Sequence, residues 1–563
     1  MLRSPRQGRR SGIIASEMQQ VQIGSPPPAT PIVRGAPSAR GRRTMLTASA
    51  ILMIAQLASR VLGMLRQTLF TAVFGGSGPE ADAFYTAFLA PDLIFNLISG
   101  GALTSAFLPT FAGYLANNSP VDEDVAWRIA SSVLYLTMLI LVPLLLLGVI
   151  FAPIYVPLLA NHNQALTART VPLVRIMLLQ PLFMALVSIC QGIANSYGRF
   201  AVPAIAPLIY NLSIIAGIGL GTHYGIQAVA WGVAAGAVLQ FAVQIPWLPY
   251  GRRVLRFTID TSLNGVREIG RLMLPRLFGQ AGVQAAFIAT TVLANRLAST
   301  PNPDLRNGWT LILLPVGIFA ASLGTTAFPA MAKLAAAGDR EGFARTVGET
   351  VSLVFFLTVP ATAALILLAP RIIRVLFYYG ASTPLDVHLM TLATIYYAVG
   401  IPGHALAEVF PRAFYAIKDT RTPVLVVTWT LALAIFLSTV AIKAIPGDNA
   451  VGGLALAVSL AVLAEAVNLA IALHRSVPEF ALGPLGWSLV RANVAAGVMT
   501  AGMGVVASYL THAINTSRLG SFVALAICAP VGVGLYLGTA VLIRAPEAQA
   551  TLRMIRRRFA RRS

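Results

Sequence analysis

The chain is poor in charged residues, in cysteine and in long loops. Only 11% of its 563 residues are charged, against about 25% in soluble domains. The two cysteines, Cys190 and Cys528, both lie in apolar runs, which excludes a disulfide framework and a cysteine metal site. The longest loop, 249–267, is too short for a folded domain. Any chemistry therefore has to take place within the membrane region.

Hydrophobic residues make up 56% of the chain and the mean hydropathy is +0.75. Many apolar runs are long enough to cross a bilayer as helices. The sequence predicts an all-α polytopic membrane protein with about fourteen transmembrane helices. The expected spans lie near 47–75, 82–114, 126–156, 169–196, 203–220, 226–248, 268–298, 308–335, 347–370, 388–416, 422–444, 450–474, 488–511 and 518–543.

Much of the net charge of +21 lies in two tails, 1–44 and 544–563. In a soluble chain this charge would indicate nucleic acid, but beside a membrane it favours anionic lipid and the cytoplasmic side. We expect both termini in the cytoplasm, which agrees with an even number of spans, and no nucleic-acid partner. The first tail lacks the apolar core of a signal peptide and is rich in Pro, Ser, Gly and Arg, so we expect it to be disordered.

Two pairs of segments match at an offset of about 220 residues. Segment 104–109 (TSAFLP) matches 325–329 (TTAFP), and 197–203 (YGRFAVP) resembles 415–423 (YAIKDTRTP). This offset predicts a parallel repeat of six spans, an architecture typical of transporters. The expected parts are the tail 1–44, an N-terminal lobe 45–250, the start of a C-terminal lobe 251–445, its last span 446–475, two extra helices 476–543, and the tail 544–563.

Two arginines, Arg60 and Arg66, lie inside the first expected span. An intramembrane arginine is costly, so a pair favours a water-filled cavity with an anionic ligand. Snorkelling to the interface is an alternative that suits Arg66 better than Arg60. Forked, charge-assisted hydrogen bonds make arginine a good ligand for phosphate. We therefore predict that both arginines bind a membrane-embedded anion such as a lipid diphosphate, and under the repeat Arg276 faces the same cavity.

Five further charged residues are candidates for gating or coupling. His404, Glu408 and Arg412 share one helical face, although Glu408 and Arg412 could form an ion pair that only fixes packing. Asp82 could equally cap a helix. No catalytic or metal-binding constellation is predicted. The candidates for gating or coupling are Asp82, Asp92, Glu408, Arg412 and Glu465.

Several short stretches together resemble the MurJ/MviN family of lipid II flippases, within the multidrug/oligosaccharidyl-lipid/polysaccharide exporter superfamily, and the resemblance covers about residues 45–543. The matching stretches are 58–63 (ASRVLG) with Arg66, 81–84 (ADAF), 101–107 (GALTSAF) with Pro109, 195–203 (NSYGRFAVP), 314–317 (LPVG) with 328–329 (FP), and 412–415 (RAFY) with 418–423 (KDTRTP).

The resemblance implies two six-helix bundles and two C-terminal helices that form a groove for a lipid tail. It implies a bacterial plasma-membrane transporter, not an enzyme, that moves undecaprenyl-diphosphate-linked disaccharide-pentapeptide to the outer leaflet by alternating access. Arg60 and Arg66 match arginines that bind the diphosphate, and Asp82 matches a gating position. No cofactor is implied beyond a coupling cation whose site the sequence does not give. Cell-wall synthesis proteins are expected partners.

The chain departs from the family at four positions. Phe95, Asn96 and Thr310 stand where many relatives carry arginines, and Gly100 stands at an acidic position. Arg276, or Arg306 about one turn before Thr310, could compensate. These departures leave open a flippase for another polyprenyl-linked oligosaccharide or a drug/cation antiporter. A membrane glycosyltransferase is disfavoured because the loops are short, and intramembrane arginines argue against a cell-wall scaffold as the sole role.

Overall fold

The computed structural model describes residues 39–76, 78–98, 102–116, 120–199, 201–248, 259–297, 302–513 and 517–549. The chain divides into two units, Met1–Ile51 and Leu52–Ser563. Helix α2 (Ala39–Phe74) begins inside the tail that we expected to be disordered. Alanine and arginine are good helix formers, so residues 39–44 extend the helix. The basic C-terminal arginines lie outside the described residues.

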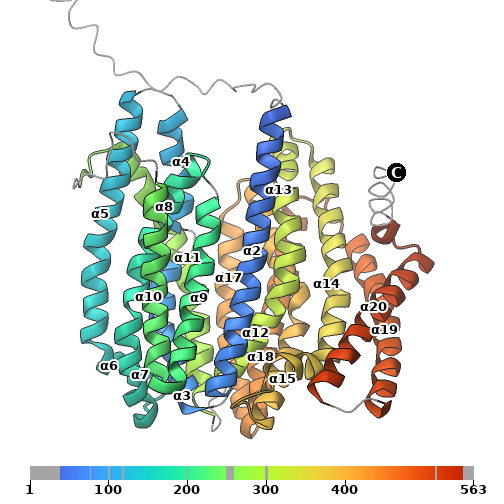
Figure 1. The fold of residues 1–563 in the computed structure, drawn as a ribbon. Coiled ribbons are helices and arrows are strands. Elements are labelled where there is room, and N and C mark those ends of the chain that lie inside the picture. The colour runs from blue at the N-terminus through green and yellow to red at the C-terminus, as the bar shows by residue number, and fades with distance from the viewer. Residues whose placement is uncertain are drawn as a thin grey trace, which may run out of the picture. The chain divides into compact units, whose positions relative to one another are not determined.

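The described residues from Leu52 onward are helical and contain no strand, which confirms the all-α fold class. The helices after α2, coloured by position in Figure 1, are α3 (Pro79–Ile98), α4 (Ala102–Ala116), α5 (Pro120–Ile150), α6 (Ala152–Leu159), α7 (Gln164–Met177), α8 (Leu179–Ser196), α9 (Ala201–Tyr224), α10 (Ile226–Gln244), α11 (Asn264–Ala294), α12 (Asn302–Pro315), α13 (Ala321–Ala336), α14 (Arg340–Phe377), α15 (Pro384–Val399), α16 (Ile401–Ala416), α17 (Arg421–Ala444), α18 (Ala450–Ser476), α19 (Leu482–Ala513) and α20 (Arg518–Leu542).

Ten helical segments of the described residues are long and apolar enough to cross a membrane, or eleven if the bent pair α15–α16 is one span. They include the expected spans from 126–156 to 226–248 and from 308–335 to 518–543. The expected spans 47–75, 82–114 and 268–298 are not among them, so the count of fourteen stays a prediction. The chain is a multi-pass membrane protein.

Five expected spans are interrupted in the structure, among them 126–156, which is divided between α5 and α6. Span 82–114 is divided between α3 and α4, and 169–196 between α7 and α8. Helices α15 and α16 meet at a 44° bend near Gly400, where Pro402 occupies the first turn of α16. After Pro315 a π-helical turn, η2 (Val316–Ala320), separates α12 from α13. Proline and π-turns break the regular hydrogen bonds of a helix, so bends are expected at these points.

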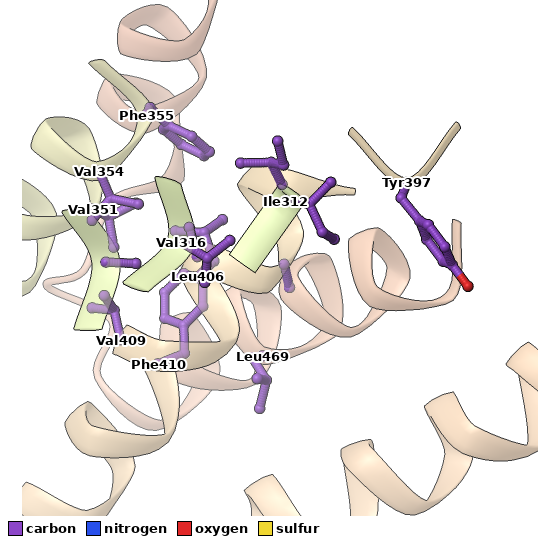
Figure 2. Packing of buried hydrophobic residues seen from close by; sticks show 14 of the residues in the cluster. Ile312, Val316, Val351, Val354, Phe355, Tyr397, Leu406, Val409, Phe410 and Leu469 are labelled. Atoms are coloured by element: carbon purple, nitrogen blue, oxygen red, sulfur yellow. The ribbon is translucent and has the colours of Figure 1, made fainter. Parts of the chain in front are cut away.

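The described helices bury several apolar cores, one of them between α4, α5, α8 and the first turns of α11. Another core uses side chains between Phe70 and Val233, and a third uses side chains between Leu293 and Leu485. Figure 2 shows part of the third core, with Val316, Val351 and Phe410 packed together. A further core joins α14 to α19 and α20. The boundaries of the expected lobes stay a prediction, because α11 also packs its first turns against α4 and α5.

Helices α9 and α10 run side by side (Figure 1) because glycines allow their backbones to meet. A Cβ placed on Gly217 would lie 3.0 Å from the Cα of Gly232. Small residues at such crossings let membrane helices pack closely. This helix pair forms part of the wall of the candidate site, since Tyr210 of α9 and Gln240 of α10 line its cavity.

Candidate functional site

A cavity of about 670 Å³ lies between α2, α3, α11, α12, η2 and α16. Arg60 and Arg66 of α2 both line it, and a second cavity of about 420 Å³ shares Arg66 with it. Asp92 and Arg306 also line both cavities. The shared lining indicates that the two cavities adjoin, so they form one polar site within the helical bundle, here called the central cavity.

Arg60 packs against the π-helical turn after α12. A Cβ placed on Gly317 would lie 2.5 Å from Nη1 and 2.8 Å from Nη2 of Arg60. A Cβ at Gly317 would force the guanidinium of Arg60 to shift. Since a π-turn shifts the helix phase by one residue, η2 turns Gly317 toward the cavity. The π-helical turn and Arg60 are therefore in contact, although more than 250 residues of sequence separate them.

Arg306 contributes a third guanidinium to the central cavity from the first turns of α12. Its Nη2 lies 3.4 Å from Oδ2 of Asp92. The backbone carbonyl of Asp92 accepts hydrogen bonds from Gln284 of α11 at 3.0 Å and from Asn96 at 2.9 Å. Asp92 therefore holds three helices, α3, α11 and α12, around the cavity. The expected span 308–335 left Arg306 outside the helix, but α12 begins at Asn302 and includes it.

A hydrogen bond between polar side chains also joins α12 to α2. Thr310 donates to Oε1 of Gln67 at 3.2 Å, and it also donates to the Arg306 carbonyl at 2.9 Å. Thr310 stands where the family pattern places an arginine. Arg306 lies one turn earlier on the same helix and lines the cavity. That it compensates for the missing arginine stays a prediction.

Glu408 and Arg412 form an ion pair on α16, with Nη1 of Arg412 2.9 Å from Oε2 of Glu408. Glu408 lines the central cavity, whereas Arg412 packs against Gly324 of α13. One turn before Glu408, the ring of His404 lies edge-on to Trp309, with centroids 5.0 Å apart. His404, Glu408 and Arg412 thus share one face of α16, as expected, but of the three only Glu408 lines the central cavity.

Asp82 and Glu465 do not line the central cavity. Asp82 is buried in the first turn of α3, near the end of α2. Glu465, on α18, is buried. It lines neither the central cavity nor the apolar cavity between α14, α16, α18 and α19. Arg276 belongs to α11, but its side chain lies outside the described residues. The functional roles assigned to all these residues stay predictions.

Sequence reasoning missed the aromatic wall of the cavity. The rings of Phe287, Trp309 and Tyr397 pack edge to face, with centroids 5.4 Å apart in each contact. Aromatic residues are common in apolar spans, so no sequence signal singled these out. They form an apolar surface beside the three guanidiniums, which suits an amphipathic ligand.

The charge of the central cavity favours an anion. Three guanidiniums, from Arg60, Arg66 and Arg306, face two carboxylates, from Asp92 and Glu408. Glu408 is already paired with Arg412, which does not line the cavity. In a site of low dielectric constant, the excess of positive charge attracts a compact anion strongly.

A separate apolar cavity of about 800 Å³ lies between α14, α16, α18 and α19. Its lining is formed largely by aliphatic side chains and small residues, and Asn493 and Thr500 are among its few polar members. Of the two helices expected to form a groove for a lipid tail, α19 lines this cavity and α20 does not, so the groove stays a prediction. A cavity of this kind fits a hydrocarbon chain.

Residues 70–527 match the family model described as "Lipid II flippase MurJ". A lipid II flippase from Burkholderia cenocepacia is 28% identical over 389 residues, covering 68% of this chain and 74% of that protein. A probable lipid II flippase from Rhizobium meliloti is 28% identical over 519 residues, covering 89% and 94%.

Solved structures agree. The chain resembles a lipid II flippase in an inward closed conformation, with a TM-score of 0.72 and 25% identity over 88% of this chain and 98% of that one. A multidrug transporter of the MATE family, inward-facing, has a TM-score of 0.62 at 13% identity, covering 79% and 98%. The second likeness shows a shared fold only.

Proposed function

Because the chain belongs to the lipid II flippase MurJ family, we propose that it carries lipid II across the membrane by alternating access. The observation that carries this proposal is the convergence of Arg60, Arg66 and Arg306 in one membrane cavity. Two of these arginines come from α2 and the third from α12. A site assembled from distant helices can be opened and closed by moving those helices apart.

The diphosphate of the lipid would bind the three guanidiniums through forked hydrogen bonds. Arg306 pairs with Asp92, so a diphosphate that binds here would exchange this contact for its own. Arg60, held against Gly317, and Arg66 make no ion pair in the described residues and are available to the anion. Asp92 would repel the anion if left unpaired, and therefore helps it to leave again.

The polyprenyl tail would occupy the apolar cavity of α14, α16, α18 and α19, outside the polar site. Burial of methylene groups there contributes roughly 0.8 kcal/mol each. The headgroup sugars would lie against the aromatic wall of Trp309 and Phe287. No covalent step is required, since transport needs only binding and a change of access.

This function implies the bacterial plasma membrane, with both basic tails in the cytoplasm against anionic lipid. An antiporter of cationic drugs shares the fold but would meet three guanidiniums in the cavity. A related polyprenyl-linked oligosaccharide would satisfy the same diphosphate site, and the headgroup alone distinguishes the two lipids.

Reconstituted vesicles test the proposal. Purified protein is incorporated with lipid II bearing a fluorescent headgroup, and an impermeant quencher reports the fraction exposed outside. Wild-type protein should move lipid II across the bilayer, and the double variant R60A/R306A should not. Equal transport by both, or movement of an unrelated diphosphate lipid but never of lipid II, would contradict the proposal.

A further inference from the structure

A second group of polar residues is buried where α2 ends, away from the central cavity. Here the turn after α2, the first turn of α3, and the N-termini of α12 and α15 meet. The carboxyl groups of Asp82, Asp304 and Asp386 come from α3, α12 and α15 respectively. All three side chains are almost completely buried, with exposed fractions of 1%, 0% and 1%.

The turn after α2 closes directly over this group. The N–H of Gly76 donates to Oδ2 of Asp386 at 3.1 Å. A Cβ placed on Gly76 would lie 2.5 Å from Oδ1 of Asp304 and 2.8 Å from the Cβ of Asp386. Nearby, the N–H of Ala381 donates to the carbonyl of Ala72 at 2.7 Å. The end of α2 is thus hydrogen-bonded to the turn before α15, and Asp304 is buried under this contact.

Asp304 differs from its two neighbours in having no hydrogen bond. Neither of its carboxyl oxygens has a partner among the described residues. Asp386, by contrast, accepts from Gly76 and from the N–H of Thr383 at 2.7 Å in a capping box. An ionised carboxylate that is fully buried and accepts no hydrogen bond is strongly disfavoured.

The two charged side chains that act on Asp304 are both carboxylates. Asp386 of α15 and Asp82 of α3 lie close enough to repel a carboxylate at this position. Tyr85 of α3 is the other titratable group that senses Asp304. None of the ion pairs of the described residues involves Asp304. The N-terminus of α12 favours a negative charge, but as a partial charge it offsets only part of the burial and repulsion.

An uncharged polar residue near Asp304 is also buried with an oxygen that has no hydrogen-bond partner. Asn307, one turn along α12, is fully buried, and its Oδ1 has no partner. Its Nδ2 donates to Thr71 of α2 at 3.1 Å and contacts the sulfur of Met390. Met390 also lies against Gly76, so Asn307 belongs to the same buried group. This end of α12 therefore carries polar oxygens that are buried without donors.

We propose that the Asp304 carboxyl binds a proton while the turn after α2 is packed against α12 and α15, and releases it when this contact opens. In the packed state the neutral acid avoids an unsolvated charge. In the open state water reaches the group, and the proton passes to solvent. In the described residues no three His, Cys, Asp or Glu side chains are arranged to hold a metal ion.

The proposal rests on the alternating-access function, and it assigns the closing step to a proton. With the N-terminus in the cytoplasm, the end of α2 faces outside. A proton taken up there by the empty transporter would stabilise the closed outer end and so reset the cycle. Protonation stabilises the packed state, so the packed fraction should fall as the pH rises.

Disulfide crosslinking tests the proposal on the full chain in native membranes. Ala72→Cys and Ala381→Cys report the packed contact, in a background with Cys190→Ala and Cys528→Ala. The crosslinked fraction should fall as the pH is raised from about 5 to about 9, the range of strongly perturbed carboxyls. In Asp304→Asn, which mimics the neutral acid, the fraction should stay high throughout, and Asp304→Glu should restore a pH response.

The control is Glu80→Gln, which removes an exposed carboxyl from the same end of α3 and should leave the pH response unchanged. A flat profile in the unmodified reporter, or an unchanged profile in Asp304→Asn, would overturn the proposal. A response to replacement of sodium by choline instead of to pH would overturn the assignment to a proton. The assay reads the contact and not lipid movement, so its failure is separate from failure of lipid II transport in vesicles.

Discussion

The guanidinium of Arg60 lies against Gly317, where a Cβ would come within 2.5 Å of Nη1. The glycine stands in the π-helical turn η2, between α12 and α13. The arginine is thereby placed in the central cavity by a backbone feature from the second half of the chain.

Gly317→Ala should displace the Arg60 guanidinium and abolish most transport, while the protein level in the membrane stays near wild type. A methyl group cannot share the space that the guanidinium occupies. Transport in vesicles measures the effect. Gly348→Ala is the matched control, since a Cβ there meets nothing within 4 Å. Equal transport by both alanine variants would show that the contact has no functional role.

Arg306→Ala should weaken lipid II binding by about tenfold or more, because a charge-assisted hydrogen bond is worth about 1.5–3 kcal/mol. Arg306→Lys should recover only part of the affinity, since a lysine lacks the planar fork. The affinity for lipid II is measured with each purified variant and compared with that of the wild type. Arg296→Ala removes an exposed arginine outside the cavity and serves as the control. Unchanged affinity in Arg306→Ala would exclude it from the site.

Gly497→Trp should block the apolar cavity and reduce occupancy by the polyprenyl tail. Gly497 lines this cavity, and open space surrounds its position. Crosslinking with a photoreactive polyprenyl diphosphate measures tail occupancy. Gly504→Trp introduces the same side chain on α19, also into open space but outside the cavity. If crosslinking is the same in both variants, the tail binds elsewhere.

Asp419 should stabilise the loop before α17 only when it is ionised. Hydrogen bonds from the Thr422 side chain, and from the N–H groups of Thr422 and Arg421, lower the pKa of Asp419 below its usual 3.8. The contribution is therefore present above pH 3.8 and is lost as the pH falls through the lower folded-state pKa. The Tm difference between wild type and Asp419→Ala, measured in detergent, should shrink on acidification. A difference that grows in acid would contradict this assignment.

The sequence identified the all-α class, because long apolar runs have few alternatives to membrane helices. It also singled out Arg60 and Arg66, since buried charge is costly. It did not give the breaks in α3–α4 or η2, which depend on how prolines are accommodated in packed helices. The pairing of Arg306 with Asp92 joins residues 214 apart, and no periodicity encodes such a contact.

The burial of Asp304 could not be predicted from the sequence either. In the sequence it follows Pro303 and looks like a solvated loop residue. Its complete burial arises only when the turn after α2, α3 and α15 meet around it. The local pattern held no sign of these three distant partners.

The most direct test of the central claim is depletion of the protein in its host, with complementation by wild type or Arg60→Ala, while lipid II in the outer leaflet is assayed. The account predicts that depletion retains lipid II in the inner leaflet, that wild type restores its export, and that Arg60→Ala does not although it reaches the membrane at a normal level. Continued appearance of lipid II outside after depletion, or full rescue by Arg60→Ala, would contradict it.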